Sequence, residues 1–255
     1  MHYCKNGFWF LNMNPLIEKY NEIKQKQVQK FNFVKIDLPL LERVNIDNTR
    51  YYKVQDGDIF KKLVSITSVI SHYNKHIFVK WRKRVGEEKA NQITQRATSR
   101  GTDTHTLIEN YLLNKDLPQV QPLSTYLFKI AKKELDRINN IHCLEGSVYS
   151  KILGVAGTTD CIAEHDEELA VIDFKTAEKP KPLEWIEHYF VQAMFYGMAY
   201  YEMTGRRVKK LVIIMTCENG ECVVYEERDL EKYMNLVVKY IEKYVTEKLD
   251  SIIDK

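Results

Sequence analysis

The stretch GTTDCIAEHDEELAVIDFKTAEKPKP, residues 157–182, decides the fold of this 255-residue chain. It holds two apolar runs, at residues 157–164 and 169–175. Each run has the length and composition of a buried strand. The polar residues His165–Glu168 between them have the composition of a turn. The stretch therefore predicts an antiparallel hairpin.

Three charged residues interrupt this apolar pattern: Asp160, Asp173 and Lys175. Asp173 and Lys175 are two residues apart, so their side chains share one face of the strand. The hairpin places Asp160 opposite or diagonal to Asp173. Two close carboxylates repel each other unless a cation lies between them, either the Lys175 ammonium or a hard ion such as Mg²⁺. The alternative is an exposed hairpin whose charged side chains face solvent.

The composition of the whole chain is that of a globular protein. Hydrophobic residues make up 44% of it, with only ten Gly and six Pro, which supports a sizeable core. The net charge of +3 is too small to indicate nucleic acid by itself. Positive charge is concentrated in residues 75–100, where Glu87 and Glu88 are the only acids. This segment is either a solvated helical face or a surface for an anionic partner.

The five cysteines are scattered and form no CxxC pair, which argues against a zinc site. Cys217 and Cys222 flank a turn and could pair in principle, but we expect free thiols in a reducing compartment. Residues 1–20 contain Lys5 and Glu18 and do not resemble a signal peptide. No apolar run has the length of a membrane span. We expect a cytoplasmic, non-secreted protein.

Before the hairpin, the sequence is mainly helical. Residues 15–31 predict a peripheral helix, and residues 50–66 predict a hairpin with Asp56–Gly57 at its turn. A helical region with breaks then begins at Ser65 or Thr67 and continues to about Asn114. Within it we expect a new helix to start at Gly101–Thr102, and Ser124 to cap the helix after it.

The second half of the chain has more strand character, beginning with a strand expected at residues 144–150. A helix is expected from Leu183 to Met203, ended by Gly205. Two strands joined by Asn219–Gly220 follow it, and a helix over residues 230–249 ends the pattern. This order predicts an α/β fold with a mixed sheet and an N-terminal helical region.

Four more residues could belong to a site with Asp160, Asp173 and Lys175. His105 and Glu109 lie one helical turn apart, as do Gln192 and Tyr196. Each has an ordinary explanation, since a lone helical His is usually a surface or core residue, and a helical Tyr is usually buried.

The ordered set is more specific than its parts. It comprises His105, Glu145, Gly157-x-x-Asp160, Ile172-Asp173-Phe174-Lys175 and Gln192-x-x-x-Tyr196. This set resembles the PD-(D/E)xK nuclease superfamily, in its RecB/Cas4-like branch, and most closely the mitochondrial genome maintenance exonuclease family and its phage relatives. The resemblance covers residues 50–250. Thr159 stands where the superfamily often has Pro.

The resemblance implies a restriction-endonuclease-like core, a mixed central β-sheet flanked by helices. Residues 1–45 would be an N-terminal helical extension, and residues 46–255 a single nuclease domain. Within that domain, residues 50–140 would form a hairpin and helical arch, and residues 141–255 the catalytic core.

The resemblance also implies roles for the site residues. Asp160, Asp173, His105 and the backbone carbonyl of Phe174 would hold two Mg²⁺ or Mn²⁺ ions. Lys175 would act on the attacking water. The remaining residues fall into three groups: Gln192 and Tyr196 organise the site, Glu145 and Glu109 support it, and Arg82, Lys83, Arg84, Arg100, Thr176, Lys179 and Lys181 contact DNA. The cysteine cluster of iron–sulfur members is missing from the sequence, so no iron–sulfur centre is expected.

These roles predict a metal-dependent DNA exonuclease that prefers single strands with a free end. The basic segment 75–100 would form the arch, with Phe78 and Trp81 available for stacking on bases. The alternatives are a structure-specific or flap endonuclease, a non-catalytic module for single-strand binding or recombination, and a purely structural protein. Abundant Lys, Ile, Asn and Tyr suggest an AT-rich genome, such as that of a phage or bacterium.

Overall fold

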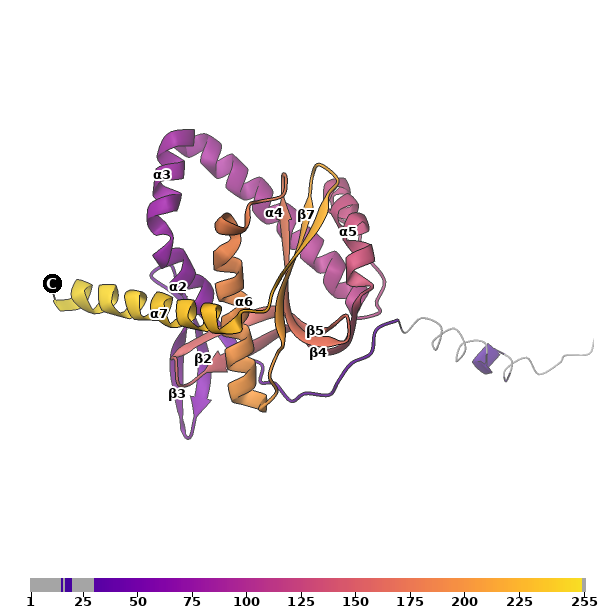
Figure 1. The fold of residues 1–255 in the computed structure, drawn as a ribbon, viewed down its shortest axis with the longest axis horizontal. Coiled ribbons are helices and arrows are strands. Elements are labelled where there is room, and N and C mark those ends of the chain that lie inside the picture. Colours follow the sequence, from indigo (N-terminus) through magenta and orange to yellow (C-terminus); the bar gives the residue numbers. More distant parts are fainter. Residues whose placement is uncertain (1–14, 16, 20–29, 254–255) are drawn as a thin grey trace, which may run out of the picture.

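The computed structural model describes residues 15, 17–19 and 30–253. Within that part of the chain, one eight-stranded mixed sheet carries helices on both faces (Figure 1). The strands are β1 (Glu42–Ile46), β2 (Thr49–Asp56), β3 (Ile59–Ser65), β4 (Ile138–Ser150), β5 (Val155–His165), β6 (Glu168–Ala177), β7 (Lys210–Cys217) and β8 (Cys222–Glu227). The helices are α2 (Ile66–Tyr73), α3 (Lys75–Val85), α4 (Glu87–Leu112), α5 (Pro122–Leu135), α6 (Leu183–Thr204) and α7 (Leu230–Ile253). The expected fold class is confirmed.

Strand β5 is the centre of the sheet because it changes partners along its length. One of its edges pairs with β4 from Val155 to His165. On the other edge, Val155 and Ala156 pair with β3, whereas β6 pairs only from Cys161 onward. The sheet therefore forks between Ala156 and Cys161, with β3 and β6 diverging from the same edge. Asp160 lies in this fork.

Two apolar cores lie on opposite faces of the sheet. Helices α2, α6 and α7 cover one face, and helices α4 and α5 cover the other. Strand β6 serves both cores, since Val171 faces the first, and Ile172 and Phe174 face the second. This alternation places Asp173 and Lys175 on the face of Val171. None of the described helices is long and apolar enough to cross a membrane.

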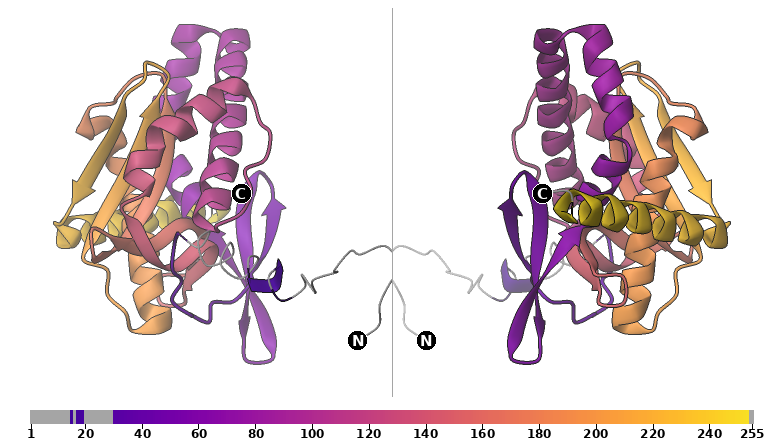
Figure 2. Two further views of the ribbon diagram at one scale, coloured as in Figure 1. Left: turned by 90° about the vertical axis from the view of Figure 1, so that its right-hand side faces the viewer. Right: turned by 90° about the vertical axis from the view of Figure 1, so that its left-hand side faces the viewer.

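Helices α3 and α4 extend beyond the sheet and form an arch, which stands upright in both views of Figure 2. Helix α3 contains no buried residue, and Ile77, Phe78 and Val79 expose 41–57% of their surface. Gly86 joins the two helices with φ 89°, a conformation that favours glycine. Helix α3 is thus held in place mainly by its connections to α2 and α4.

Most predicted elements are confirmed, including the hairpin at residues 50–66, the turn after His165 and the end of α6 at Gly205. The N-terminal segment differs from the prediction. Most of the helix expected at residues 15–31 lies outside the described residues. Residues 30–46 are extended rather than helical, with β1 at their end and a bridge between Phe33 and Ile141. The domain division at residue 45 stays a prediction.

Two helix starts were predicted wrongly. Helix α4 begins at Glu87, and Gly101 lies in its interior, where the helix passes close to Thr176. Helix α5 begins at Pro122, a residue whose fixed φ suits a first turn. The Ser124 hydroxyl donates a hydrogen bond to the Arg100 carbonyl at 3.4 Å instead of capping the helix.

Candidate functional site

The fork brings Asp160 and Asp173 together. The register pairs Cys161 with Ile172, and one further step places Asp160 opposite Asp173. At that point the backbone N–H of Phe174 donates to Asp160 Oδ2 at 2.9 Å. The Asp160 side chain thus takes the place of a ladder partner, and Asp160 lies opposite Asp173, as the sequence predicted. The fork of the sheet at this point was not predicted.

Asp173 is only 1% exposed, which excludes the alternative of a solvent-facing hairpin. Its Oδ2 forms an ion pair with the Lys175 ammonium, but its buried Oδ1 receives no hydrogen bond from any described residue. Burial is the main cause that raises the pKa of Asp173 to about 6; Lys175 opposes this rise, and the nearby Asp160 adds to it. Burial lowers the pKa of Lys175, yet Asp173 and Asp160 outweigh it, and the net direction is upward.

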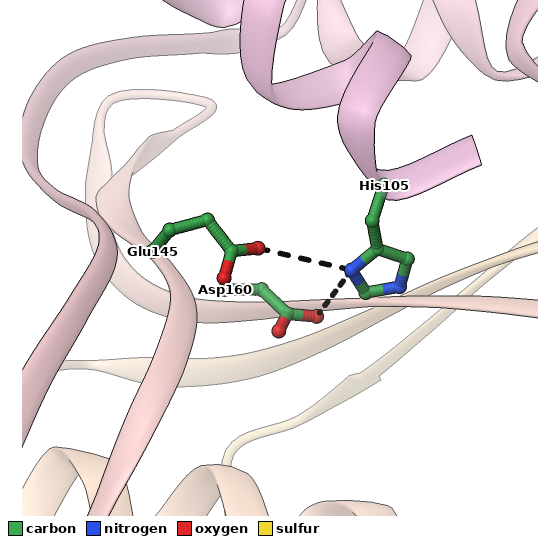
Figure 3. A group of neighbouring side chains, drawn as sticks. All are labelled: His105, Glu145 and Asp160. Atoms are coloured by element: carbon green, nitrogen blue, oxygen red, sulfur yellow. Dashed lines mark ion pairs between the residues drawn. The ribbon is translucent and has the colours of Figure 1, made fainter. Parts of the chain in front are cut away.

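His105 reaches the same site from helix α4 (Figure 3). Its Nε2 lies 2.8 Å from the Phe174 carbonyl oxygen, a group that can only accept, so Nε2 carries the proton. Its Nδ1 lies 3.7 Å from Asp160 Oδ2 and 3.8 Å from Glu145 Oε1. Burial lowers the pKa of His105, but Glu145 and Asp160 raise it more, and the net direction is upward.

Glu145 is placed by an irregularity in β4. The sequence predicts it at the start of a strand, whereas it lies inside β4 with φ 47°, in the left-handed region. This local twist points its carboxylate toward His105 (Figure 3). Glu109, the other expected support, lines a cavity together with His105 and Glu145 but forms no ion pair with His105 among the described residues.

This donor set fits a hard divalent cation. One ligand atom each from His105, Glu145 and Asp160 lies within 4.8 Å of the other two. A neutral His105 would turn its Nδ1 lone pair toward two carboxylates, an arrangement that a positive charge between them stabilises. Asp173 Oδ1, which receives no hydrogen bond from a described residue, is a further carboxylate oxygen available as a metal ligand. Carboxylate oxygens with one imidazole are ligands that suit Mg²⁺ or Mn²⁺.

Helix α6 closes the fork with Tyr196 and Gln192. The Gln192 amide donates to the Tyr196 hydroxyl at 3.0 Å. Tyr196 is buried and packs on Gly157, where a Cβ atom would lie 2.7 Å from Tyr196 Cε1. Burial, with Asp160 and Asp173 nearby, raises the pKa of Tyr196 well above its usual range. The expected pair therefore lies at the site, and glycine at 157 is required for the fit.

Three further residues at the site were absent from the residues that the sequence predicted. Arg43 and Arg50, on neighbouring strands β1 and β2, line a cavity of about 590 Å³ together with His105 and Glu145. The Lys175 ammonium lies 5.0 Å from the centre of the Tyr189 ring. Tyr189 could have been found from its helical spacing with Gln192 and Tyr196. The two arginines come close only through the sheet pairing, which leaves no local pattern.

Arg100 and Thr176 were predicted to contact DNA, and the structure gives Arg100 another role. Arg100 is 9% exposed and forms an ion pair with Glu218. Its Nε donates to the Thr176 hydroxyl oxygen at 3.1 Å. These contacts tie helix α4 to the ends of β6 and β7 and take up the buried Arg100 guanidinium. Thr176 is half-exposed and only accepts from Arg100, so its contact with DNA stays a prediction.

The other basic residues remain accessible to different degrees. Lys83 and Arg84 are exposed on α3, and Lys179 is exposed after β6. Arg82 pairs with Glu87 and lies 5.6 Å from the centre of the Phe78 ring. The Lys181 ammonium lies 3.4 Å from the Tyr189 hydroxyl, next to the site.

Comparison with known proteins agrees with this geometry. Residues 81–251 match the family model of the PD-(D/E)XK nuclease superfamily. The chain is 33% identical to mitochondrial genome maintenance exonuclease 1 of Xenopus tropicalis over 109 residues, which are 40% of this chain and 31% of that protein. The human protein of the same name is 28% identical over 123 residues, which are 46% of this chain and 34% of that protein. The chain thus spans about a third of the length of these exonucleases.

Bacterial proteins are also similar. An ATP-dependent helicase/nuclease subunit from Clostridium botulinum is 25% identical over 128 residues, covering 40% of this chain and 10% of that protein. Among solved structures, a candidate exonuclease from Eubacterium rectale matches with a TM-score of 0.36 and 13% identity, over 72% of this chain and 66% of that one.

Proposed function

The chain belongs to the PD-(D/E)XK nuclease superfamily, and on this premise we propose that it is a metal-dependent DNA exonuclease acting on single strands with a free end. The observation that carries the proposal is the convergence of Asp160, Asp173, Lys175 and His105 at the fork of the sheet. A purely structural protein would have no use for a buried carboxylate whose Oδ1 lacks a donor.

The ligands proposed for two Mg²⁺ or Mn²⁺ ions are Asp160, Asp173, His105 and the Phe174 carbonyl. That carbonyl accepts from His105, and its second lone pair is available to a metal. Such an ion, when bound, polarises phosphate oxygens and lowers the pKa of a bound water. Glu145 holds His105 in place from β4. No iron–sulfur centre is expected.

Lys175 is the residue proposed to act on the attacking water and on the charge that develops at the phosphate. Its ammonium is anchored by Asp173 on one side and lies over the Tyr189 ring on the other. This anchoring limits the reorganisation that the reaction would need. Gln192 donates to Tyr196, and the Tyr196 ring packs on Gly157 of β5, so the pair would organise the α6 side of the site.

The preference for single strands rests on the arch. Helix α3 presents Lys83, Arg84 and the half-exposed ring of Phe78, a combination that suits phosphates and unpaired bases. Lys179 and Lys181 extend the positive surface beyond β6. A requirement for a free end follows if the strand must pass beneath the arch. The proposed location is the cytoplasm of a bacterium or a phage-infected host.

The test uses linear and circular single-stranded DNA, each incubated with Mg²⁺, Mn²⁺ or EDTA. We expect degradation of the linear strand alone, and only with metal. Cleavage of the circle would move the assignment to a structure-specific or flap endonuclease. Binding of both DNAs without cleavage would leave a non-catalytic single-strand binding or recombination module. A terminal label on the linear strand reports the direction of degradation.

A further inference from the structure

A second cavity lies beside the candidate site. It has a volume of about 540 Å³ and lies between the β1–β2 turn, helix α2 and the C-terminal half of α7. Its described lining residues include three cationic side chains, those of Arg50, Lys75 and Lys248, and no Asp or Glu. None of the three cations forms an ion pair with a described carboxylate. Among the described residues, the lining therefore carries a net positive charge, and the nearby Glu247 carboxylate is already paired with His72.

Hydroxyl groups line the same cavity as the lysines. Thr67, Ser68 and Ser71 all line it from helix α2. The Ser68 hydroxyl accepts from the Arg50 backbone N–H at 3.1 Å and receives a hydrogen bond from Ser65 at 2.9 Å. These bonds tie α2 to β2, so the hydroxyls keep a fixed position relative to the Arg50 backbone. Hydroxyl donors together with unpaired cations are groups that recognise phosphate oxygens.

The lining offers little surface for stacking on bases. Among the described lining residues, Tyr244 is the only Tyr, Phe or Trp, and only 8% of its surface is exposed. Its ring meets the His72 ring edge-on, with centroids 5.1 Å apart. His72 is itself paired with Glu247 at 2.7 Å. The chemistry of the cavity thus matches the sugar-phosphate backbone and is independent of base sequence.

Arg50 joins the two cavities, because it lines both this one and the cavity that holds His105 and Glu145. A strand bound at the site would therefore meet, at Arg50, a residue that also borders the second cavity. We propose that the second cavity is a subsite that binds phosphate groups of the substrate strand next to the bond that is cleaved. This inference rests on the proposed nuclease function.

The test replaces Lys75 and Lys248, the two lysines that line the second cavity and not the first. The variant is Lys75→Gln with Lys248→Gln, and the matched control is Lys129→Gln with Lys239→Gln, two exposed helical lysines that line neither cavity. Steady-state cleavage is measured on thymidine oligonucleotides of graded length, with and without terminal phosphates. Lys75→Arg with Lys248→Arg tests rescue, and thermal unfolding checks that each variant folds.

We expect the variant to raise KM for long strands by roughly tenfold while kcat is unchanged. The shortest strands, which do not reach the subsite, should keep their KM. The slope of log affinity against log salt should fall by about 1.4, since each phosphate contact contributes about 0.7. A loss on all long strands assigns the cavity to internal phosphates, and a loss only with terminal phosphates assigns it to the strand end.

Equal KM values and salt slopes in the variant and its control would overturn the inference. Binding is measured separately in an Asp173→Asn background, so that affinity can be read without cleavage. If Asp173→Asn itself cleaved normally, the proposed function would fail, whatever the lysines did. If it were inactive and the lysine variant bound as tightly as the control, only the subsite would fail.

Discussion

The fork and the arch differ in how the fold holds them. At the fork, Asp173 and Tyr196 are almost fully buried, and both are fixed by strands and by helix α6. On the arch, helix α3 buries no residue and exposes Phe78 and Lys83. A group that must hold a defined geometry is built into the core, whereas a group that must meet a variable strand is left free. Substitutions in the two regions should therefore differ in kind.

The largest effect is expected from Asp173→Asn at the fork. It removes a proposed metal ligand and the anchor of Lys175, so kcat should fall by about a thousandfold, about 4 kcal/mol in activation free energy. The fold should persist, because the side chain keeps its shape and loses a buried charge. Glu168→Gln, at the other end of β6, is the matched control and should retain activity. Unfolding of Asp173→Asn would contradict this separation of catalysis from stability.

Gly157→Ala should disturb the packing of the fork. The new Cβ would lie 2.7 Å from Tyr196 Cε1 and 3.2 Å from Ile66 Cγ2, so the free energy of unfolding should fall by about 1–3 kcal/mol. Gly101→Ala is the contrast, since its Cβ would meet only Thr176 Oγ1 at 3.9 Å. It should stabilise helix α4 by about 1 kcal/mol. Equal effects in urea denaturation would mean that the fork is not tightly packed.

Glu218→Gln tests whether Arg100, the partner of Glu218, stabilises the fold or binds DNA. It leaves the buried Arg100 without its charged partner, which should cost about 1.5–3 kcal/mol of stability. Single-strand affinity in low salt should stay the same, because Arg100 is tied to Thr176 and away from solvent. A loss of affinity without a loss of stability would restore Arg100 as a DNA contact.

The smallest effect on the fold is expected at the arch. Lys83→Gln with Arg84→Gln should leave the free energy of unfolding within about 0.5 kcal/mol of the parent. The salt slope for binding single strands should fall by about 1.4, from two lost phosphate contacts. Fluorescence anisotropy over a range of salt concentrations measures this slope. An unchanged slope would remove the arch from the binding surface.

Much of the fork could be predicted because its pattern is local. The spacing of Asp173 and Lys175 fixes a shared face, and the turn after His165 fixes the hairpin that brings Asp160 near. These relations depend on the two-residue period of strands, which the sequence displays directly. The end of α6 at Gly205 followed from an equally local pattern.

The remaining features depend on contacts between distant segments. Arg50 joins the site through the pairing of β3 with β5, and Glu145 turns toward His105 through a single left-handed residue. Arg100 has the sequence context of a surface cation, but the packing of α4 on β6 buries it. Gly101 was predicted to precede a helix, but it lies inside α4, where its only near neighbour for a Cβ atom is Thr176 Oγ1 at an ordinary contact distance of 3.9 Å.

The central claim is that one fork in the sheet holds the metals that the reaction uses. It is tested most directly by calorimetric titration of Mn²⁺ into the parent protein, Asp160→Asn and Asp173→Asn, without DNA. Saturable binding to the parent that is abolished or strongly weakened in both variants is the predicted result. Equal binding by all three proteins would place the metal elsewhere and contradict this claim.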